Sequence, residues 1–346
     1  MLKGVEPQAG TTEERRLAST PISLLDLAFV GRNEAVGDAL QNSVRYARRA
    51  EELGYHRVWY AEHHNMATIA SSATAVLIAH VAAHTERIRL GSGGVMLPNH
   101  SPLVIAEQFG TLASLHPGRI DLGLGRAPGT DQVTLLALRR SPMSADRFPQ
   151  DVQELQGYLS GETLVPGVNA IPGKGTKVPL YILGSSHFGA KLAAALGLPY
   201  GFASHFAPGA LEDAVALYRQ QFEPSEQLDR PYVIAGVNVI AAESEEEAQE
   251  QLRYTQRRRV STLLGGGRQL TDEQADAILE TPQGQQLKQM TKYTAAGTPD
   301  RVRDYLEWFA GHADADELMV VHLGSTLEKR LRSLELLAEV ARPVTP

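Results

Sequence analysis

Two hydrophobic patterns alternate along the chain after Pro21: short runs rich in Val, Ile and Leu, and longer segments whose apolar residues recur every three or four positions. The first pattern predicts buried strands, and the second predicts helices that bury one face. Strands are expected at residues 23–30, 57–61, 88–96, 120–125, 180–183, 200–203, 232–241 and 317–322. Helices are expected at residues 38–53, 72–84, 103–115, 146–159, 188–196, 210–222, 244–263, 299–310 and 327–340.

This alternation predicts a parallel sheet that helices cover on both faces, which is typical of the α/β class. Eight strand–helix units fit a closed (β/α)8 TIM barrel better than an open, doubly wound sheet. An open dinucleotide-binding sheet would place Gly-x-Gly-x-x-Gly directly after a strand, and the nearest sequence, residues 91–94, lacks the third glycine in place. We therefore expect a (β/α)8 barrel.

The domain organisation follows from two segments that break this alternation. Residues 1–20 are polar and lack periodicity, so we expect a mobile N-terminal arm before a single barrel domain at 21–346. Residues 265–297 contain a Gly-Gly-Gly turn, a helix expected to begin at Thr271 and Gln-rich sequence. They predict an insertion beside the barrel mouth, which serves either as a lid or as an appended surface element.

The composition excludes several classes of chemistry. The chain has no cysteine, so disulfides, thiolate nucleophiles and cysteine-ligated metal centres are excluded, and redox chemistry would need a bound cofactor. The net charge of −7 disfavours a broad nucleic-acid surface. The basic run 257–259 follows the acidic run 243–250 and is interpreted as a solvated helix face. No apolar run approaches the ~20 residues of a membrane span, and the charged residues 13–16 are unlike a signal peptide, so we expect a cytoplasmic protein.

Candidate chemistry is sought at the carboxyl ends of the strands, where barrel active sites gather. The second predicted strand ends in Ala-Glu-His-His-Asn at residues 61–65. Strand alternation places His63 on the interior face with Trp59 and Ala61, and places Glu62 and His64 on the opposite face. The residues alone leave open whether His63 handles a proton, contacts a ligand or is structural. The spacing of a helical His-Glu-x-x-His metal site is absent, so no metal site is expected.

Glycines cluster at the end of the third predicted strand, at Gly91, Gly93 and Gly94. They indicate either a backbone that approaches a flat ligand closely or tight packing of the barrel. Arg126 ends the fourth strand among small residues, which suits a phosphate or carboxylate ligand but also a structural salt bridge.

Small polar residues join the fifth predicted strand to an apolar helix, at Gly184, Ser185 and Ser186. Serines at this position either cap the helix or, together with free backbone N–H groups, hold a phosphate. His205 and Phe206 follow the sixth strand, where they either line a pocket or turn the chain.

Taken together, these segments resemble the bacterial luciferase-like, flavin-dependent monooxygenases, from about Ile22 to Val340. The landmarks that carry the resemblance occur in the family's order, at residues 61–65, 89–97, 116–126, 184–186 and 203–206. The chain looks closest to the uncharacterised single-component branch of that family. The resemblance implies a barrel that receives reduced FMN from a separate NAD(P)H-dependent flavin reductase and uses O2 to oxygenate a small organic substrate.

The resemblance also implies roles for individual residues. The histidine that luciferases use near the flavin's reactive edge corresponds to His63. The phosphate-binding arginine corresponds to Arg126, and the phosphate-binding serine to Ser185, flanked by Gly184 and Ser186. The family's non-proline cis peptide corresponds to Gly93-Gly94, which would place both glycines at the flavin.

Two differences from the light-emitting relatives refine the expected activity, and the way in which family members commonly pair refines the expected oligomeric state. Gly125 stands where those relatives carry a reactive cysteine, and Gly184 replaces an acidic residue, so light emission is not the expected activity. Family members commonly pair through helices near the second and third barrel units, and the Ala-rich helix expected at 72–84 suits close approach of two copies. We expect a homodimer.

Two other functions remain open on the same scaffold. One is a dehydrogenase that depends on coenzyme F420, whose longer anionic tail would favour more basic surroundings than a chain of net charge −7 suggests. The other is a flavin-binding protein without catalysis.

Overall fold

The computed structural model describes residues 17–127, 129–265 and 270–341. Eight parallel strands close into a barrel in the order β1 to β7, then β9 and back to β1. The strands are β1 (Ile22–Asp26), β2 (Arg57–Tyr60), β3 (Arg89–Met96), β4 (Ile120–Gly125), β5 (Leu180–Gly184), β6 (Tyr200–Phe202), β7 (Val233–Ala241) and β9 (Glu317–His322). The predicted (β/α)8 barrel is confirmed, and each of its strands coincides with one of the eight expected runs.

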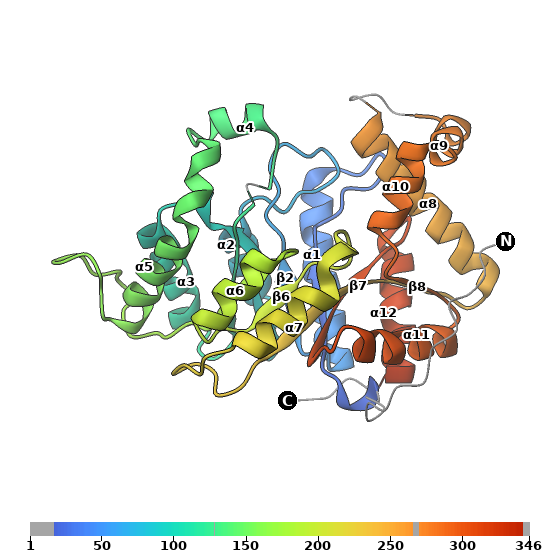
Figure 1. The fold of residues 1–346 in the computed structure, drawn as a ribbon. Helices are drawn as coiled ribbons and strands as arrows, with labels where there is room; N and C mark the ends of the chain where they lie inside the picture. Colours follow the sequence, from blue (N-terminus) through green and yellow to red (C-terminus); the bar gives the residue numbers. More distant parts are fainter. Residues whose placement is uncertain (1–16, 128, 266–269, 342–346) are drawn as a thin grey trace.

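Helices pack around this barrel (Figure 1). They are α1 (Val36–Leu53), α2 (Thr74–Ala82), α3 (Pro102–Leu115), α5 (Phe148–Ser160), α6 (His187–Ala195), α7 (Leu211–Gln221), α8 (Glu245–Leu264), α11 (Pro299–His312) and α12 (Leu327–Ala341). Gly54 ends α1 with a φ of 81°, and its N–H bonds back to the helix. This is the left-handed cap that the sequence predicts for a glycine at that position.

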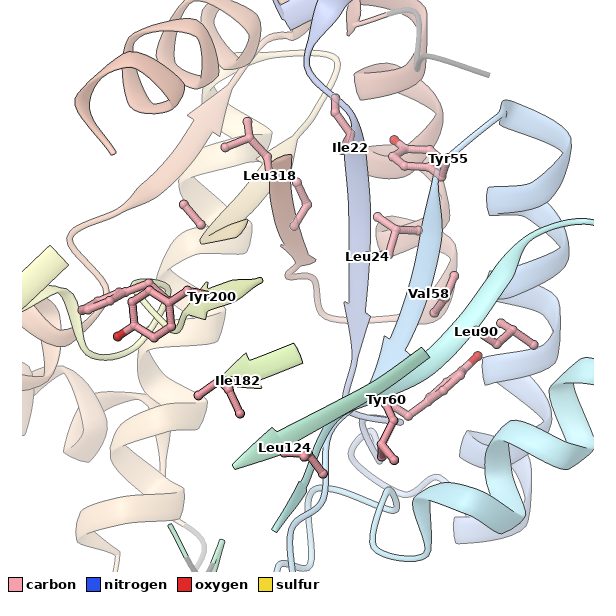
Figure 2. Packing of buried hydrophobic residues seen from close by; sticks show 14 of the residues in the cluster. Ile22, Leu24, Tyr55, Val58, Tyr60, Leu90, Leu124, Ile182, Tyr200 and Leu318 are labelled. Carbon is pink, nitrogen blue, oxygen red and sulfur yellow. The ribbon is translucent and has the colours of Figure 1, made fainter. Parts of the chain in front are cut away.

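The hydrophobic core has two layers, because each parallel strand is buried on both faces. The outer layer lies between strands and helices and includes Ile22, Leu24 and Val58 (Figure 2). The inner layer fills the barrel and includes Leu25, Trp59, Ala61, Tyr181, Ile234, Met319 and Val321. Trp59 and Ala61 therefore face the interior, as the alternation of strand β2 requires.

Residues 270–297 depart from the simple alternation, as predicted. They form α9 (Asp272–Leu279), α10 (Pro282–Met290) and β8 (Thr294–Gly297). Helix α9 begins after the N-cap Thr271, whose side chain forms a capping box with Gln274. Strand β8 pairs with the end of β7 outside the barrel circuit, and α9 and α10 lie beside α8 (Figure 1). Most of the predicted Gly-Gly-Gly turn lies in 266–269, outside the described residues.

The first described residues differ from the expectation. Of the predicted arm 1–20, residues 1–16 lie outside the described residues, but Leu17–Ser19 form a 3-10 turn. The Leu17 side chain is fully buried in the core, and its N–H donates to the carboxylate of Glu307 in α11. Residues 17–20, which the expectation assigned to the arm, thus lie against the barrel, where the buried Leu17 side chain holds them.

Candidate active site

A cavity of about 600 Å³ opens at the C-terminal end of the barrel. Every residue to which the resemblance assigns a role lines it, namely His63, Gly93, Gly94, Arg126, Gly184, Ser185 and Ser186, whereas Gly91 does not. They arrive from β2, β3, β4 and β5, which is why they are distant in sequence and close in space. The fold thus brings every position with an assigned role to one place.

His63 follows β2 and lines the cavity on the same face as Trp59 and Ala61. Its backbone N–H donates to the Ser71 carbonyl at 3.0 Å, while its Nδ1 is buried without a hydrogen-bond partner. Burial lowers the pKa of His63, although the neighbouring Glu62 carboxylate opposes that shift. The imidazole is therefore neutral near pH 7, and its Nδ1 is enclosed by protein.

The opposite face of this segment is held by Glu62, whose side chain is 1% exposed. Its carboxylate accepts a hydrogen bond from the Met96 N–H at 3.0 Å and lies 2.9 Å from His64 Nε2 and 2.8 Å from His100 Nε2. Burial raises the pKa of Glu62, but the hydrogen bonds from His100 and His64 bring it below its usual value. This ionised carboxylate ties the end of β2 to the end of β3 and so positions His63, a role that sequence reasoning missed.

The peptide bond between Gly93 and Gly94 is cis, as the resemblance implied. A Cβ on Gly93 would lie 2.8 Å from Leu25 Cδ1, and one on Gly94 would lie 2.7 Å from Leu183 Cδ1. No side chain fits at either position, so tight packing of the barrel requires glycine here. Bare backbone at this wall can approach a flat ligand closely.

Arg126 stands beside the turn that joins β5 to α6. Its guanidinium carbon lies 4.1 Å from the ring centroid of Phe188, in the first turn of α6, and no acid in the described chain pairs with it. Ser186 is the N-cap of α6 but its side chain makes no capping bond, and the hydroxyl of Ser185 makes none to the described chain. An arginine, two hydroxyls and a helix N-terminus together form a site suited to a phosphate.

His205 also lines the cavity, which settles the open choice between pocket and turn. Its Nδ1 is enclosed without a partner, and burial lowers the pKa of His205 to about 3, with smaller contributions from Arg259 and His63. Gly236 of β7 leaves the space that the ring occupies, since a Cβ there would collide with it. A second neutral imidazole thus stands near His63.

Helix α8 contributes a wall of the cavity, and this corrects the interpretation of the basic run 257–259. Arg257 faces outward and pairs with Asp272 and Asp276 of α9 at the surface. Arg258 and Arg259 instead line the cavity and are half-buried. The sequence could not show this, because the division depends on α9 covering one side of α8.

Within the described residues, no group of three or more His, Asp or Glu side chains is placed to hold a metal ion. None of the helices in the same part of the chain is both long and apolar enough to cross a membrane.

Comparison with known proteins agrees with this geometry. The family model described as luciferase-like monooxygenase matches residues 20–314. A luciferase-like monooxygenase of Escherichia coli (strain K12) is 48% identical over 322 residues, which cover 92% of this chain and 96% of the relative. An N-acetyl-S-alkylcysteine monooxygenase of Bacillus subtilis (strain 168) is 35% identical and covers 92% of this chain and 97% of its own length.

Solved structures share the fold. The crystal structure of apo-MsnO8 has a TM-score of 0.86 at 36% identity and covers 95% of this chain and 99% of its own. A Baeyer-Villiger monooxygenase from Pseudomonas putida in complex with FMN has a TM-score of 0.69 at 16% identity, over 94% of this chain and 99% of its own. An F420-dependent secondary alcohol dehydrogenase has a TM-score of 0.68 at 17% identity, over 93% and 98%. The last two show the fold alone, whereas the family match and the closer relatives establish that this chain belongs to the luciferase-like monooxygenase family.

Proposed function

We propose that the protein is an FMN-dependent monooxygenase that uses reduced FMN and O2 to oxygenate a small organic substrate. The observation that carries the proposal is the convergence of a phosphate-type site, a glycine wall and a neutral histidine on one cavity. The FMN complex of the distant barrel supports the cofactor by analogy of fold. When bound, the reduced flavin supplies the electrons that activate O2.

The residues of this chain divide the remaining work. Arg126 and the hydroxyls of Ser185 and Ser186 bind the FMN phosphate, and Gly93 and Gly94 let the ring system lie against the backbone. Apolar side chains such as Trp59 and Met319 exclude water from the cavity. The imidazole of His63 lines the cavity, accepts or returns a proton there and is the proposed catalytic residue.

The partners follow from the same proposal. A separate NAD(P)H-dependent flavin reductase supplies reduced FMN in the cytoplasm, and the protein acts as a homodimer. The dimer is supported by α2, where Val76, Ala79 and Ala83 form an exposed apolar stripe with Val76 70% exposed. Light scattering at micromolar concentration should give twice the mass of the 37.5 kDa chain, and the monomer mass would contradict the dimer.

Two titrations and one assay test the function against its alternatives. We expect the visible spectrum of FMN, and not that of F420, to change when the protein is added. With FMN, a flavin reductase and NADH, the protein should form an oxygenated product from at least one member of an organic substrate panel. Tighter binding of F420 would favour the dehydrogenase, and FMN binding without any product would favour a noncatalytic binder.

A further inference from the structure

The charges that line the cavity are strongly unbalanced. Five cationic side chains line it, Arg126, Arg258, Arg259, Lys288 and Arg330, against the single carboxylate of Glu34. The chain as a whole has the opposite balance, with a net charge of −7. A positive cavity in a negative protein indicates an anionic ligand.

Three of these six charged groups already have partners. Arg330 lies 3.7 Å from Asp26, and Lys288 lies 3.1 Å from Glu280. Glu34 accepts hydrogen bonds from the Gly31 N–H and from Asn42 Nδ2, each at 2.6 Å. Only Arg126, Arg258 and Arg259 remain without an acid in the described chain.

The two arginines of α8 differ from their neighbour Arg257, which two aspartates of α9 neutralise. Arg258 donates only to the Val30 carbonyl, at 3.2 Å, and no hydrogen bond or ion pair joins Arg259 to the described chain. A guanidinium group ordinarily stays charged at physiological pH. Burying part of a cation without an anion costs free energy. The two half-buried arginines in the cavity wall therefore indicate that a ligand supplies the anion.

The position of these arginines separates them from the phosphate site. Arg126 follows β4 and stands at the N-terminus of α6, whereas Arg258 and Arg259 belong to the helix after β7. Arg259 is close enough to His205 for its charge to contribute to the low pKa of that imidazole. Much of the cavity wall is apolar, with Leu25, Ile69 and Met319 among the lining residues.

We propose that Arg258 and Arg259 bind the carboxylate of the organic substrate, so that the substrate class is a carboxylic acid with an apolar body. This inference rests on the proposed function, because it takes the cavity as the place where the substrate meets FMN. Two guanidinium groups can hold a carboxylate by charge-assisted hydrogen bonds and leave its apolar body against the inner barrel wall. The arginines thereby select the substrate, while Arg126 selects the cofactor.

The test compares each acid with its uncharged amide by calorimetric titration into the protein, with and without bound FMN. The probes are hexanoate, octanoate, phenylacetate and 3-phenylpropionate, each paired with its primary amide. We expect at least one acid to bind about ten-fold more tightly than its amide, the scale of one charge-assisted hydrogen bond. Arg259→Gln and Arg258→Gln should remove that preference without changing the affinity for the amide, and Arg259→Lys should keep part of it.

Arg253→Gln is the matched control, because it removes the same charge from the exposed face of the same helix. It should keep the preference of the wild-type protein. The inference is overturned if no acid binds more tightly than its amide, or if both α8 variants retain the preference. Loss of FMN affinity in the α8 variants would also overturn it, since the arginines would then serve the cofactor. Failure of the wild-type protein to bind FMN would instead contradict the proposed function. The preference for acid over amide is distinguishable from that outcome, because it is also measured without FMN.

Discussion

The two ends of the barrel interior use the same types of charged residue in opposite ways. At the N-terminal ends of the strands, Arg57 is buried and bonds to Asp121 at 2.8 Å and to Glu317 at 3.0 Å. At the C-terminal end, Arg126 and Arg259 line a cavity and meet no acid in the described chain. The first arrangement is satisfied by the fold itself, whereas the second leaves its charges available to a ligand. The comparison separates charges that the fold itself satisfies from charges that are open to a ligand at the end where barrel active sites gather.

The titration behaviour of the two ends differs in the same way. Burial raises the pKa of Asp121, but Arg57 and Arg89 hold it below its usual value, so the carboxylate stays ionised inside the barrel. At the cavity, burial lowers the pKa of His205, and it lowers the pKa of His63 although the Glu62 carboxylate opposes that shift. The N-terminal end of the barrel keeps its buried carboxylate charged, and the C-terminal end keeps the imidazoles of His63 and His205 neutral.

The largest effect on function is expected from His63→Ala. The change should lower substrate oxygenation by roughly 10²–10⁴-fold, because a positioned acid–base group is lost. FMN affinity and the free energy of unfolding should stay close to those of the wild-type protein, and reduced flavin should be diverted to hydrogen peroxide. Product and peroxide are measured in the same reaction. A variant that couples oxygen to product as well as the wild-type protein would remove His63 from the catalytic role.

The largest effect on stability is expected at the other end of the barrel, from Arg57→Met. Asp121 and Glu317, both 0% exposed, would lose their shared cation. Removing one partner from a buried ion network costs about 3–5 kcal/mol. Urea denaturation should show this loss, and an unchanged midpoint would contradict a stabilising role. The matched control is Arg126→Met, which should unfold like the wild-type protein because its guanidinium group has no acid partner.

An intermediate effect is expected for Arg126→Ala, which tests the C-terminal end directly. Loss of a charge-assisted hydrogen bond to the FMN phosphate should weaken FMN binding by about 1.5–3 kcal/mol. Fluorescence titration of FMN measures the dissociation constant, and riboflavin, which lacks the phosphate, is the control ligand. The assignment is refuted if the variant and the wild-type protein bind FMN equally well.

The fold was predictable because the apolar runs of the barrel strands and the periodicity of the main helices are local properties of the sequence. Strand β8 and helix α10 were not predicted, since Thr294–Gly297 is a short run without alternation and α10 is Gln-rich. The same limit explains the arm, where the burial of Leu17 depends on its contact with a helix far along the chain.

The candidate site was also predictable only in part. The positions that line the cavity could be found at strand ends, and strand alternation placed His63 inward. Pairings between distant loops could not be found: Glu62 meets His100 across 38 positions of sequence. The direction of Arg258 and Arg259 likewise depends on the packing of α9 and α10 against α8. Local pattern therefore predicts which strand ends line the cavity, and tertiary contacts decide which of its charges have partners.

The smallest expected effect concerns the pair of Glu62 and His64. This pair lies at the C-terminal end of the barrel, but its groups have protein partners, like the charges at the N-terminal end. The hydrogen bond to Glu62 raises the pKa of His64 in the folded protein. The stabilisation that depends on the charged imidazole is therefore complete below the pKa of an unfolded histidine, about 6.5, and is lost as pH rises through the pKa of the folded protein. The pKa of Glu62 is lowered overall, so its contribution is complete above its unfolded pKa and is lost as pH falls through the folded value. His64→Gln should therefore lower the free energy of unfolding most near pH 5.5, by about 1 kcal/mol because Glu62 keeps its hydrogen bonds to Met96 and His100, and less at pH 8. Urea denaturation at both pH values measures the difference, with His84→Gln as the control because that exposed histidine has no acid partner in the described chain. If the difference in the free energy of unfolding grew toward pH 8, His64 would be neutral in the folded protein. If His64→Gln lost oxygenation activity while His63→Ala kept it, His64 rather than His63 would face the flavin.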